Sequence, residues 1–210
     1  MAYNQFTARE ITEKFGVSYV DVDGLFAEVA AAPIDPSLTW YLKQSVPLAL
    51  SISTEKARSE MIITPILIEA RRLRKGAVSL FSGTEFTVDP ARGLNGFCDY
   101  LLSLSRTQIE IEAPVVAIVE AKNENIRAGI PQCVAEMLAA RIFNEGRGRP
   151  TRVVFGAVTS GSDWRFLRLR DATVEIDTAE YYASDVERIV GVLVHMLATA
   201  EASIAASAAS

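Results

Sequence analysis

The chain has 210 residues, half of them hydrophobic and 22% charged, with 21 Lys and Arg against 26 Asp and Glu, a net charge of −5. This length suits a single domain with a small extension, and it buries a core without disulfides. Two cysteines, Cys98 and Cys133, and one histidine, His195, are too few for a disulfide framework or a four-ligand zinc site. His195 lies in an apolar run that predicts a core or interface position. We therefore expect any chemistry to rest on carboxylates, lysine and a metal that prefers oxygen ligands.

The N-terminus lacks the basic-then-apolar pattern of a signal peptide. We identify no window close to the ~20 apolar residues that a membrane-spanning helix needs. These two features predict a cytoplasmic protein that does not associate with a membrane and keeps its thiols reduced.

Residues 1–52 are predicted to form a helical extension that packs on the rest of the chain. Thr7 and Glu10 fit a capping box, in which the Thr7 hydroxyl caps a helix and Glu10 reaches back to its start. From Ser53 the spacing of apolar residues indicates a long helix. Pro65 interrupts this helix, so the helix either kinks there or restarts with proline in its first turn.

The remaining chain alternates between strand and helix patterns. Strands are predicted over 77–81, 85–88, 96–102, 108–112, 115–119, 151–159, 164–169 and 174–176, with helices over 129–144 and 185–200. The continuous apolar run at 115–119 is typical of a strand buried on both faces. The order predicts an α/β or α+β domain over 53–200, with a mixed central sheet flanked by helices, followed by a flexible tail at 201–210.

Three charged residues interrupt or end the apolar strands. Asp99 lies inside an apolar run, where an unpaired buried carboxylate costs several kcal/mol, on the order of other unpaired buried polar groups. The alternative is an edge strand with Asp99 facing water. Glu120 and Lys122 follow the run at 115–119 and alternate onto the same face. Taken alone, they indicate only a strand that ends in solvated charges.

These residues gain meaning if the two strands are neighbours. Asp99 and Glu120 would then converge and repel each other unless a divalent cation lay between them. Mg²⁺, with Mn²⁺ as a substitute, suits such oxygen donors, and the backbone carbonyl of Ala121 offers another ligand. Lys122 would orient or deprotonate an attacking water and offset charge at a phosphorus centre.

The segments Gly96–Asp99 and Val115–Lys122, followed by a helix and an apolar strand, resemble the PD-(D/E)XK nuclease superfamily. The resemblance implies a restriction-endonuclease-like core of a helix, a three-stranded meander, a helix and a further strand, covering about Ser53–Val158. It also implies metal-dependent hydrolysis of phosphodiester bonds in DNA. Cys98 replaces the proline that gives the motif its name.

The resemblance assigns roles to particular side chains. It implies Asp99 and Glu120 as metal-binding acids, Lys122 as the catalytic lysine, Glu60 as a metal-binding acid from the first core helix, and Gln132 as a site residue on the helix after the lysine strand. Glu69 is a weaker match for the helix acid. The tyrosine that often follows the glutamine by one turn is absent, because Ala135 and Glu136 stand there.

The charge distribution leaves the partner open. A net charge of −5 disfavours binding to nucleic acid, but residues 141–170 carry a net +5 and residues 171–190 a net −5. The two blocks either neutralise each other or leave a basic stripe. Two alternatives to a nuclease follow: a catalytically silent nuclease-like module that binds nucleic acid or protein, and an interaction protein that forms a homodimer through 184–200.

Overall fold

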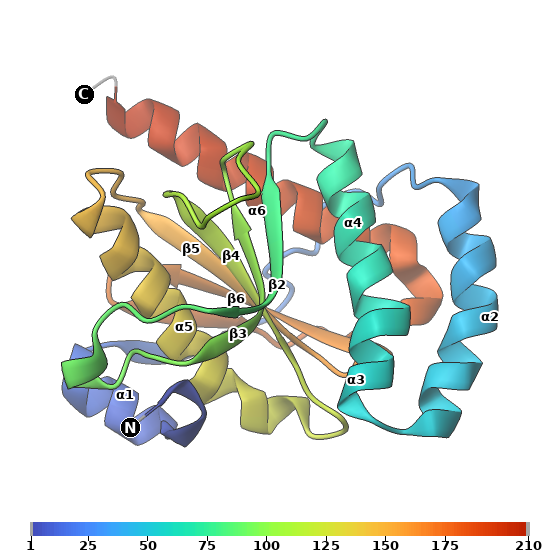
Figure 1. The fold of residues 1–210 in the computed structure, drawn as a ribbon, viewed down its shortest axis with the longest axis horizontal. Helices are drawn as coiled ribbons and strands as arrows, with labels where there is room; N and C mark the ends of the chain where they lie inside the picture. The colour runs from blue at the N-terminus through green and yellow to red at the C-terminus, as the bar shows by residue number, and fades with distance from the viewer. Residues whose placement is uncertain (1, 209–210) are drawn as a thin grey trace.

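The computed structural model describes residues 2–208, which form an eight-stranded mixed β-sheet with helices on both faces (Figure 1). The expected α+β class is therefore confirmed. The strand order is β1-β7-β6-β5-β4-β3-β2, and β8 pairs with β6. The strands are β1 (Ser18–Val22), β2 (Ser79–Glu85), β3 (Phe97–Ser103), β4 (Val115–Ala121), β5 (Val153–Thr159), β6 (Asp163–Arg170), β7 (Thr173–Asp177) and β8 (Tyr181–Tyr182). The α-helices are α1 (Ala8–Phe15), α2 (Pro36–Ile52), α3 (Glu55–Arg58), α4 (Thr64–Leu73), α5 (Ile126–Gly146) and α6 (Val186–Ala208).

From α3 to β5 the chain forms helices, three strands, a helix and a further strand. Strands β2, β3 and β4 form an antiparallel meander, and α5 then carries the chain to β5, which pairs parallel with β4. A parallel neighbour requires such a crossover, so the helix between β4 and β5 sets the direction of β5. The C-terminal ends of β4 and β5 therefore lie next to each other at the same end of the sheet.

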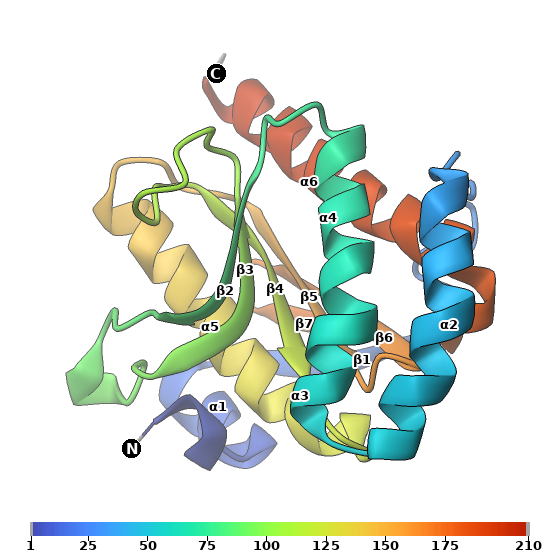
Figure 2. The ribbon, with the colours of Figure 1, turned by 45° about the vertical axis from the view of Figure 1, so that its right-hand side comes forward.

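The two faces of the sheet carry separate hydrophobic cores. Helices α2, α4 and α6 cover one face, whereas α1 and α5 cover the other (Figure 2). Buried Ile66 and Leu193 belong to the first core, and Ile11 and Leu138 belong to the second. Each strand between β3 and β6 is thus buried on both sides, which explains its continuous apolar sequence.

Helix α6 departs from two sequence predictions. Within the described residues, Ala183–Ala206 is the one helical stretch long and apolar enough to cross a membrane, with a mean hydropathy of 1.8. Of its most apolar window, 44% is buried, as also happens in the core helix of a soluble protein. His195 is exposed on this helix, so the core position predicted for it is wrong. The helix turns His195 away from the buried stripe that contains Leu193 and Met196.

The chain ends also differ from prediction. Residues 1–52 supply a strand as well as helices. This strand, β1, pairs parallel with β7 at the edge of the sheet, and its half-buried Tyr19 is followed by the exposed residues Val20 and Asp21. The predicted tail is helical as far as Ala208, in keeping with the high helix propensity of alanine. Positions 209–210 of that tail lie outside the described residues.

Two strand predictions in the meander need correction. The predicted strands at 77–81 and 85–88 are replaced by the single strand β2, which ends at Glu85. The predicted strand at 108–112 is a loop, in which Ile109 is 96% exposed. The Gln108 side chain donates to the Leu80 carbonyl at 2.7 Å and accepts from the Leu80 N–H at 3.2 Å. The side-chain amide of Gln108 therefore occupies the free edge of β2, and residues 108–112 add no strand.

The long helix from Ser53 continues past Pro65 through a π-helical turn, so the predicted restart with Thr64 as a cap is wrong. Thr54 caps α3, a π-helical turn spans Ser59–Ile63, and α4 begins at Thr64. Proline has no N–H to donate to the carbonyl of Met61, four residues earlier. The Ser45 hydroxyl donates to that carbonyl instead, at 2.9 Å.

Asn144 fastens the end of α5 to the start of β4. Its side chain accepts from the Val115 N–H at 2.7 Å, donates to the Val115 carbonyl at 2.7 Å, and donates to the Thr151 hydroxyl at 3.2 Å. Replacement Asn144→Ala is expected to lower the free energy of unfolding by about 2–4 kcal/mol, because it leaves buried backbone groups unpaired. Urea denaturation measures the change, with the exposed neighbour variant Glu145→Ala as control. Equal stability of the two variants would contradict the prediction.

Candidate active site

Asp99 and Glu120 lie side by side at the end of the β3–β4 ladder. Tyr100 pairs with Val119, so one step further along the antiparallel register Asp99 stands opposite Glu120. The Ala121 N–H donates to Asp99 Oδ2 at 2.8 Å, so a side chain replaces the backbone acceptor there. The two strands are therefore neighbours, as the site hypothesis required. Ala121 meets Asp99 through its N–H group.

Glu120 is a carboxylate enclosed by protein. It is 1% exposed and points toward α5; its Oε1 accepts from Lys122 Nζ, and its Oε2 has no hydrogen-bond partner. The pKa of Glu120 is raised to about 8, first by burial and then by the charge of Asp99, while Lys122 opposes both. Removing a carboxylate from water disfavours its charged form, which explains the direction of this shift.

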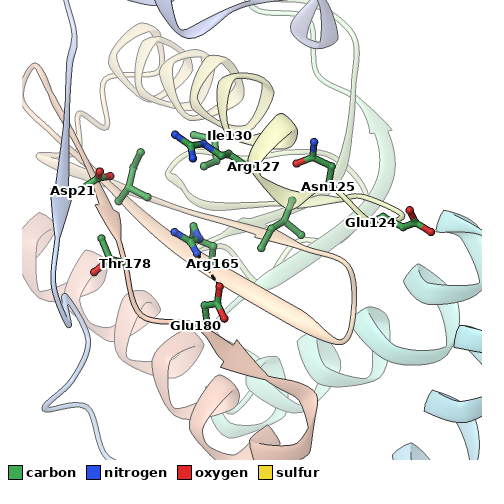
Figure 3. A pocket seen from close by; sticks show the side chains of 10 residues that line it. Asp21, Glu124, Asn125, Arg127, Ile130, Arg165, Thr178 and Glu180 are labelled. Carbon is green, nitrogen blue, oxygen red and sulfur yellow. Dashed lines mark ion pairs between the residues drawn. The ribbon is translucent and has the colours of Figure 1, made fainter.

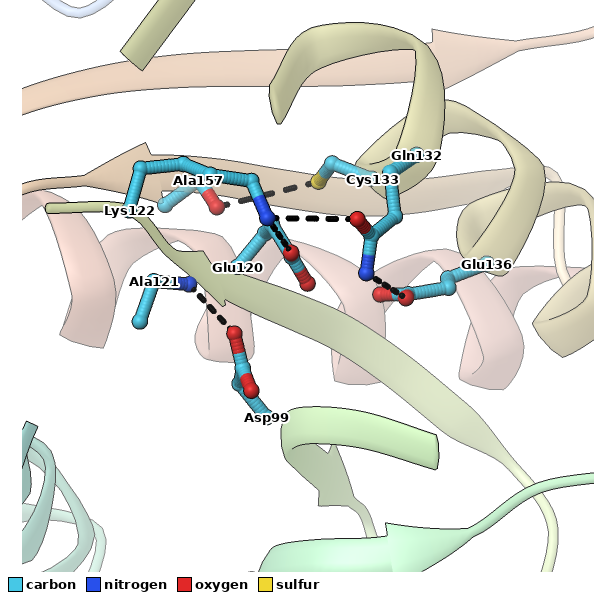
Figure 4. Close-up of polar contacts among 8 residues, drawn as sticks. All are labelled: Asp99, Glu120, Ala121, Lys122, Gln132, Cys133, Glu136 and Ala157. Atoms are coloured by element: carbon cyan, nitrogen blue, oxygen red, sulfur yellow. Dashed lines mark hydrogen bonds and ion pairs between the residues drawn. The ribbon is translucent and has the colours of Figure 1, made fainter. Parts of the chain in front are cut away.

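Lys122 lies between Glu120 and Gln132 (Figure 4). Its Nζ donates to Gln132 Oε1 at 3.2 Å. Burial lowers the pKa of Lys122, but the carboxylate of Glu120 more than compensates, so the pKa is raised. Gly129 lets α5 cover this side chain, because a Cβ atom there would lie 3.0 Å from Lys122 Cγ and 2.7 Å from Val158 Cγ1.

Asp99 opens toward the other face of the sheet. Figure 4 draws its carboxylate on one side of β4 and the side chains of Lys122 and Gln132 on the other. Asp99 lines a cleft of about 290 Å³ together with Glu55, Glu60 and Tyr100. The Tyr100 hydroxyl donates to the Ser59 carbonyl at 3.0 Å and lies 2.9 Å from the Thr64 hydroxyl, which holds the first core helix against β3.

The candidate helix acids differ in where they lie. Glu60 lines the cleft, but its side chain is 61% exposed and pairs with Lys56 at 3.4 Å. Glu69 lies elsewhere: it accepts from the Asp35 N–H at 2.7 Å and from Arg72, and so is fully occupied. The structure therefore does not bring Glu69 to the site.

Sequence reasoning missed two acids near Glu120. Glu55 lines the cleft, and its charge raises the pKa values of both Glu120 and Lys122. In the sequence, Glu55 follows the Thr54 cap and therefore indicated only the start of a helix. Glu136 is fully buried on α5 and accepts from Gln132 Nε2 at 3.2 Å. The spacing of four residues after Gln132 was the signal that could have identified it.

Part of the arginine-rich block at 141–170 is paired within the chain. Arg168 pairs with Glu175, and Arg165 pairs with Glu180 at 3.5 Å, so the acidic block neutralises part of the basic one. Arg147 stacks over the Phe143 ring at 5.1 Å.

A second cavity lies beyond the start of α5. Arg127 and Arg165 line this pocket of about 370 Å³ (Figure 3). Arg165 belongs to the same row across the sheet as Glu120, because Glu120 pairs with Val158 and Val158 with Arg165. Asp21, Glu124 and Glu180 also line the pocket, so its carboxylates outnumber its guanidinium groups.

Asp99 and Glu120 carry oxygen donors of the kind that a small divalent cation takes, although Asp99 opens toward one face of the sheet and Glu120 points toward α5. Two carboxylates are present, one with an orphaned buried oxygen, and Mg²⁺ takes such hard oxygen ligands while keeping several waters. Within residues 2–208, no group of three or more His, Cys, Asp or Glu side chains forms a ready metal site. A cation here would rely on the two acids, the Ala121 carbonyl and water.

Searches of protein-family models and of curated proteins found no match to this chain.

Proposed function

We propose that the protein is a metal-dependent nuclease of the PD-(D/E)XK type, with a restriction-endonuclease-like core and DNA as substrate. The observation that carries the proposal is the meeting of Asp99 and Glu120 at the shared end of β3 and β4, with Lys122 paired to Glu120. These are the residues that the motif assigns. The element order from α3 to β5 supports the same proposal.

The chain's own residues would divide the work. Asp99 and Glu120, with the Ala121 carbonyl, would hold Mg²⁺ or Mn²⁺. When bound, the cation supplies Lewis-acid stabilisation of the phosphoryl oxygens and lowers the pKa of water. Lys122 would position the attacking water and stabilise negative charge at the phosphorus centre, while Gln132 holds the lysine in place.

Cleavage assays test the proposal directly. The purified protein is incubated with labelled single- and double-stranded DNA, and with RNA, in Mg²⁺, in Mn²⁺ and in EDTA. We expect cleavage of DNA in the presence of either cation and none in EDTA. Absence of cleavage of every substrate with both metals would contradict the proposal.

A catalytically silent module is the second candidate. The ion pair between Glu120 and Lys122 favours this candidate, because Lys122 already neutralises the carboxylate that a metal ion would otherwise bind. Titration with Mn²⁺ by calorimetry separates the two: a nuclease binds the ion, whereas a silent module shows no heat at millimolar metal. The homodimer predicted through 184–200 is a separate question that light scattering answers.

Glu55 and Glu60 provide a comparison within the first core helix. Glu55 influences Glu120 electrostatically, whereas Glu60 pairs with Lys56 at the surface. We therefore expect Glu55→Gln to lower the cleavage rate about tenfold, on the scale of residues that support metal sites. Glu60→Gln should leave the rate nearly unchanged. Steady-state rates at saturating Mg²⁺ measure both. A larger effect of Glu60→Gln would assign the helix acid to Glu60, as the motif implied.

A further inference from the structure

Glu136 is a buried acid that the motif does not use. It is 0% exposed on α5; its Oε1 accepts from Gln132 Nε2 at 3.2 Å, and its Oε2 has no partner. Gln132 Oε1 in turn accepts from Lys122 Nζ at 3.2 Å, and Lys122 donates to Glu120. A continuous chain of contacts therefore runs from the core of α5 to the candidate metal-binding carboxylate (Figure 4).

The chemistry of the glutamine amide gives this chain a direction. One end of the amide donates and the other accepts, and rotation by half a turn exchanges them. Lys122 is a cation with no acceptor, so it can bind only the carbonyl end of Gln132. The Oε1 atom of Glu136 accepts from the NH₂ end. The contacts of Gln132 with Lys122 and with Glu136 therefore match the same one of the two amide orientations.

We propose that Glu136 is a positioning residue that fixes the amide of Gln132, so that its oxygen holds Lys122 against Glu120. The inference rests on the proposed function for its catalytic meaning, but the orientation itself is a property of the folded chain. Without an acceptor at position 136, the contact with Lys122 alone orients the amide of Gln132. The amide is then less fixed, and Lys122 loses part of its fixed orientation.

Nuclear magnetic resonance tests the orientation without any catalytic assay. The chain has only five lysines, so ¹³Cε labelling gives a spectrum that a Lys122→Arg variant assigns. In the wild type we expect inequivalent Hε protons on Lys122 and a Gln132 amide proton shifted by its bond to Glu136. Both signatures should weaken in Glu136→Met, which keeps the length of the side chain, and persist in Glu136→Gln, which keeps an acceptor oxygen.

Two further variants guard against trivial effects. Met137→Leu, also fully buried on α5, controls for altered packing and should leave both signatures unchanged. If Glu136→Met does not fold, Gln132→Leu breaks the same chain at a partly exposed position and should release Lys122 equally. Signatures that survive both Glu136→Met and Gln132→Leu would overturn the proposal. Equal loss in Glu136→Gln and Glu136→Met would assign Glu136 a role through charge and also overturn it.

Cleavage kinetics then connect the orientation with the proposed function. We expect Glu136→Met to lower kcat by about 10–100-fold with KM unchanged, as for residues that orient metal-site groups, and Glu136→Gln to recover most of it. If the wild type shows the spectral signatures but cleaves nothing, the proposed function fails while the positioning role stands. If it cleaves normally and the variants match it, the positioning role fails alone.

Discussion

Replacement of Glu120 by glutamine is expected to reduce metal-dependent cleavage of DNA by on the order of a thousandfold, the scale seen when a charge-stabilising group is removed from an active site. The amide keeps the shape of the side chain but removes the negative charge that a cation requires. It also leaves Lys122 without its counter-charge in a buried site. Initial rates on labelled DNA at saturating Mg²⁺ measure the loss, and calorimetry with Mn²⁺ should show weakened binding.

The control is Glu110→Gln, which makes the same chemical change on the exposed loop between β3 and β4. It should cleave at the wild-type rate. Circular dichroism checks that both variants fold. If Glu120→Gln is folded and cleaves at the rate of the control, the catalytic site does not lie at the end of the β3–β4 ladder.

The central part of this site was predictable from sequence because its signals are local. A continuous apolar run predicted β4, and two charges that ended it predicted polar side chains on one face. Asp99, placed within an apolar strand, required a partner, and the structure supplies the Ala121 N–H group. Each of these inferences used only neighbouring residues and the period of a strand.

The remainder depends on contacts between distant segments. The spacing of Glu69 and Arg72 on one helix allows their pairing, but the sequence does not show that the distant Asp35 N–H also binds Glu69, or that Glu55 faces the cleft. The same holds for Gln108, whose amide occupies the edge of β2. Such pairings are set by how helices and loops dock, which periodicity does not encode.

The stability of the protein is expected to fall as pH rises from about 5 to 8. The pKa of Glu120 is raised to about 8, first by burial, and burial also raises the pKa of Glu136. The unfolded chain releases these protons near pH ~4.3, the usual value for glutamate. Between these limits the folded state binds more protons than the unfolded state, so the free energy of unfolding decreases with pH. The slope reaches up to about 1.4 kcal/mol per pH unit for each proton.

Urea denaturation at pH 5, 6, 7 and 8 measures this slope in the wild type, in Glu120→Gln and in Glu136→Gln. Each substitution removes one group that must lose its proton in a buried place, so each variant should show a shallower slope. Glu69 and Glu175, whose bonds to Arg72 and Arg168 lower their pKa values, stabilise the fold above pH ~4.3 and lose that effect only on acidification. Glu69 and Glu175 therefore change the stability only below pH ~4.3, whereas Glu120 and Glu136 change it above that pH. A wild-type slope of zero between pH 5 and 8 would mean that Glu120 and Glu136 ionise in the folded chain as readily as in water, which their burial argues against.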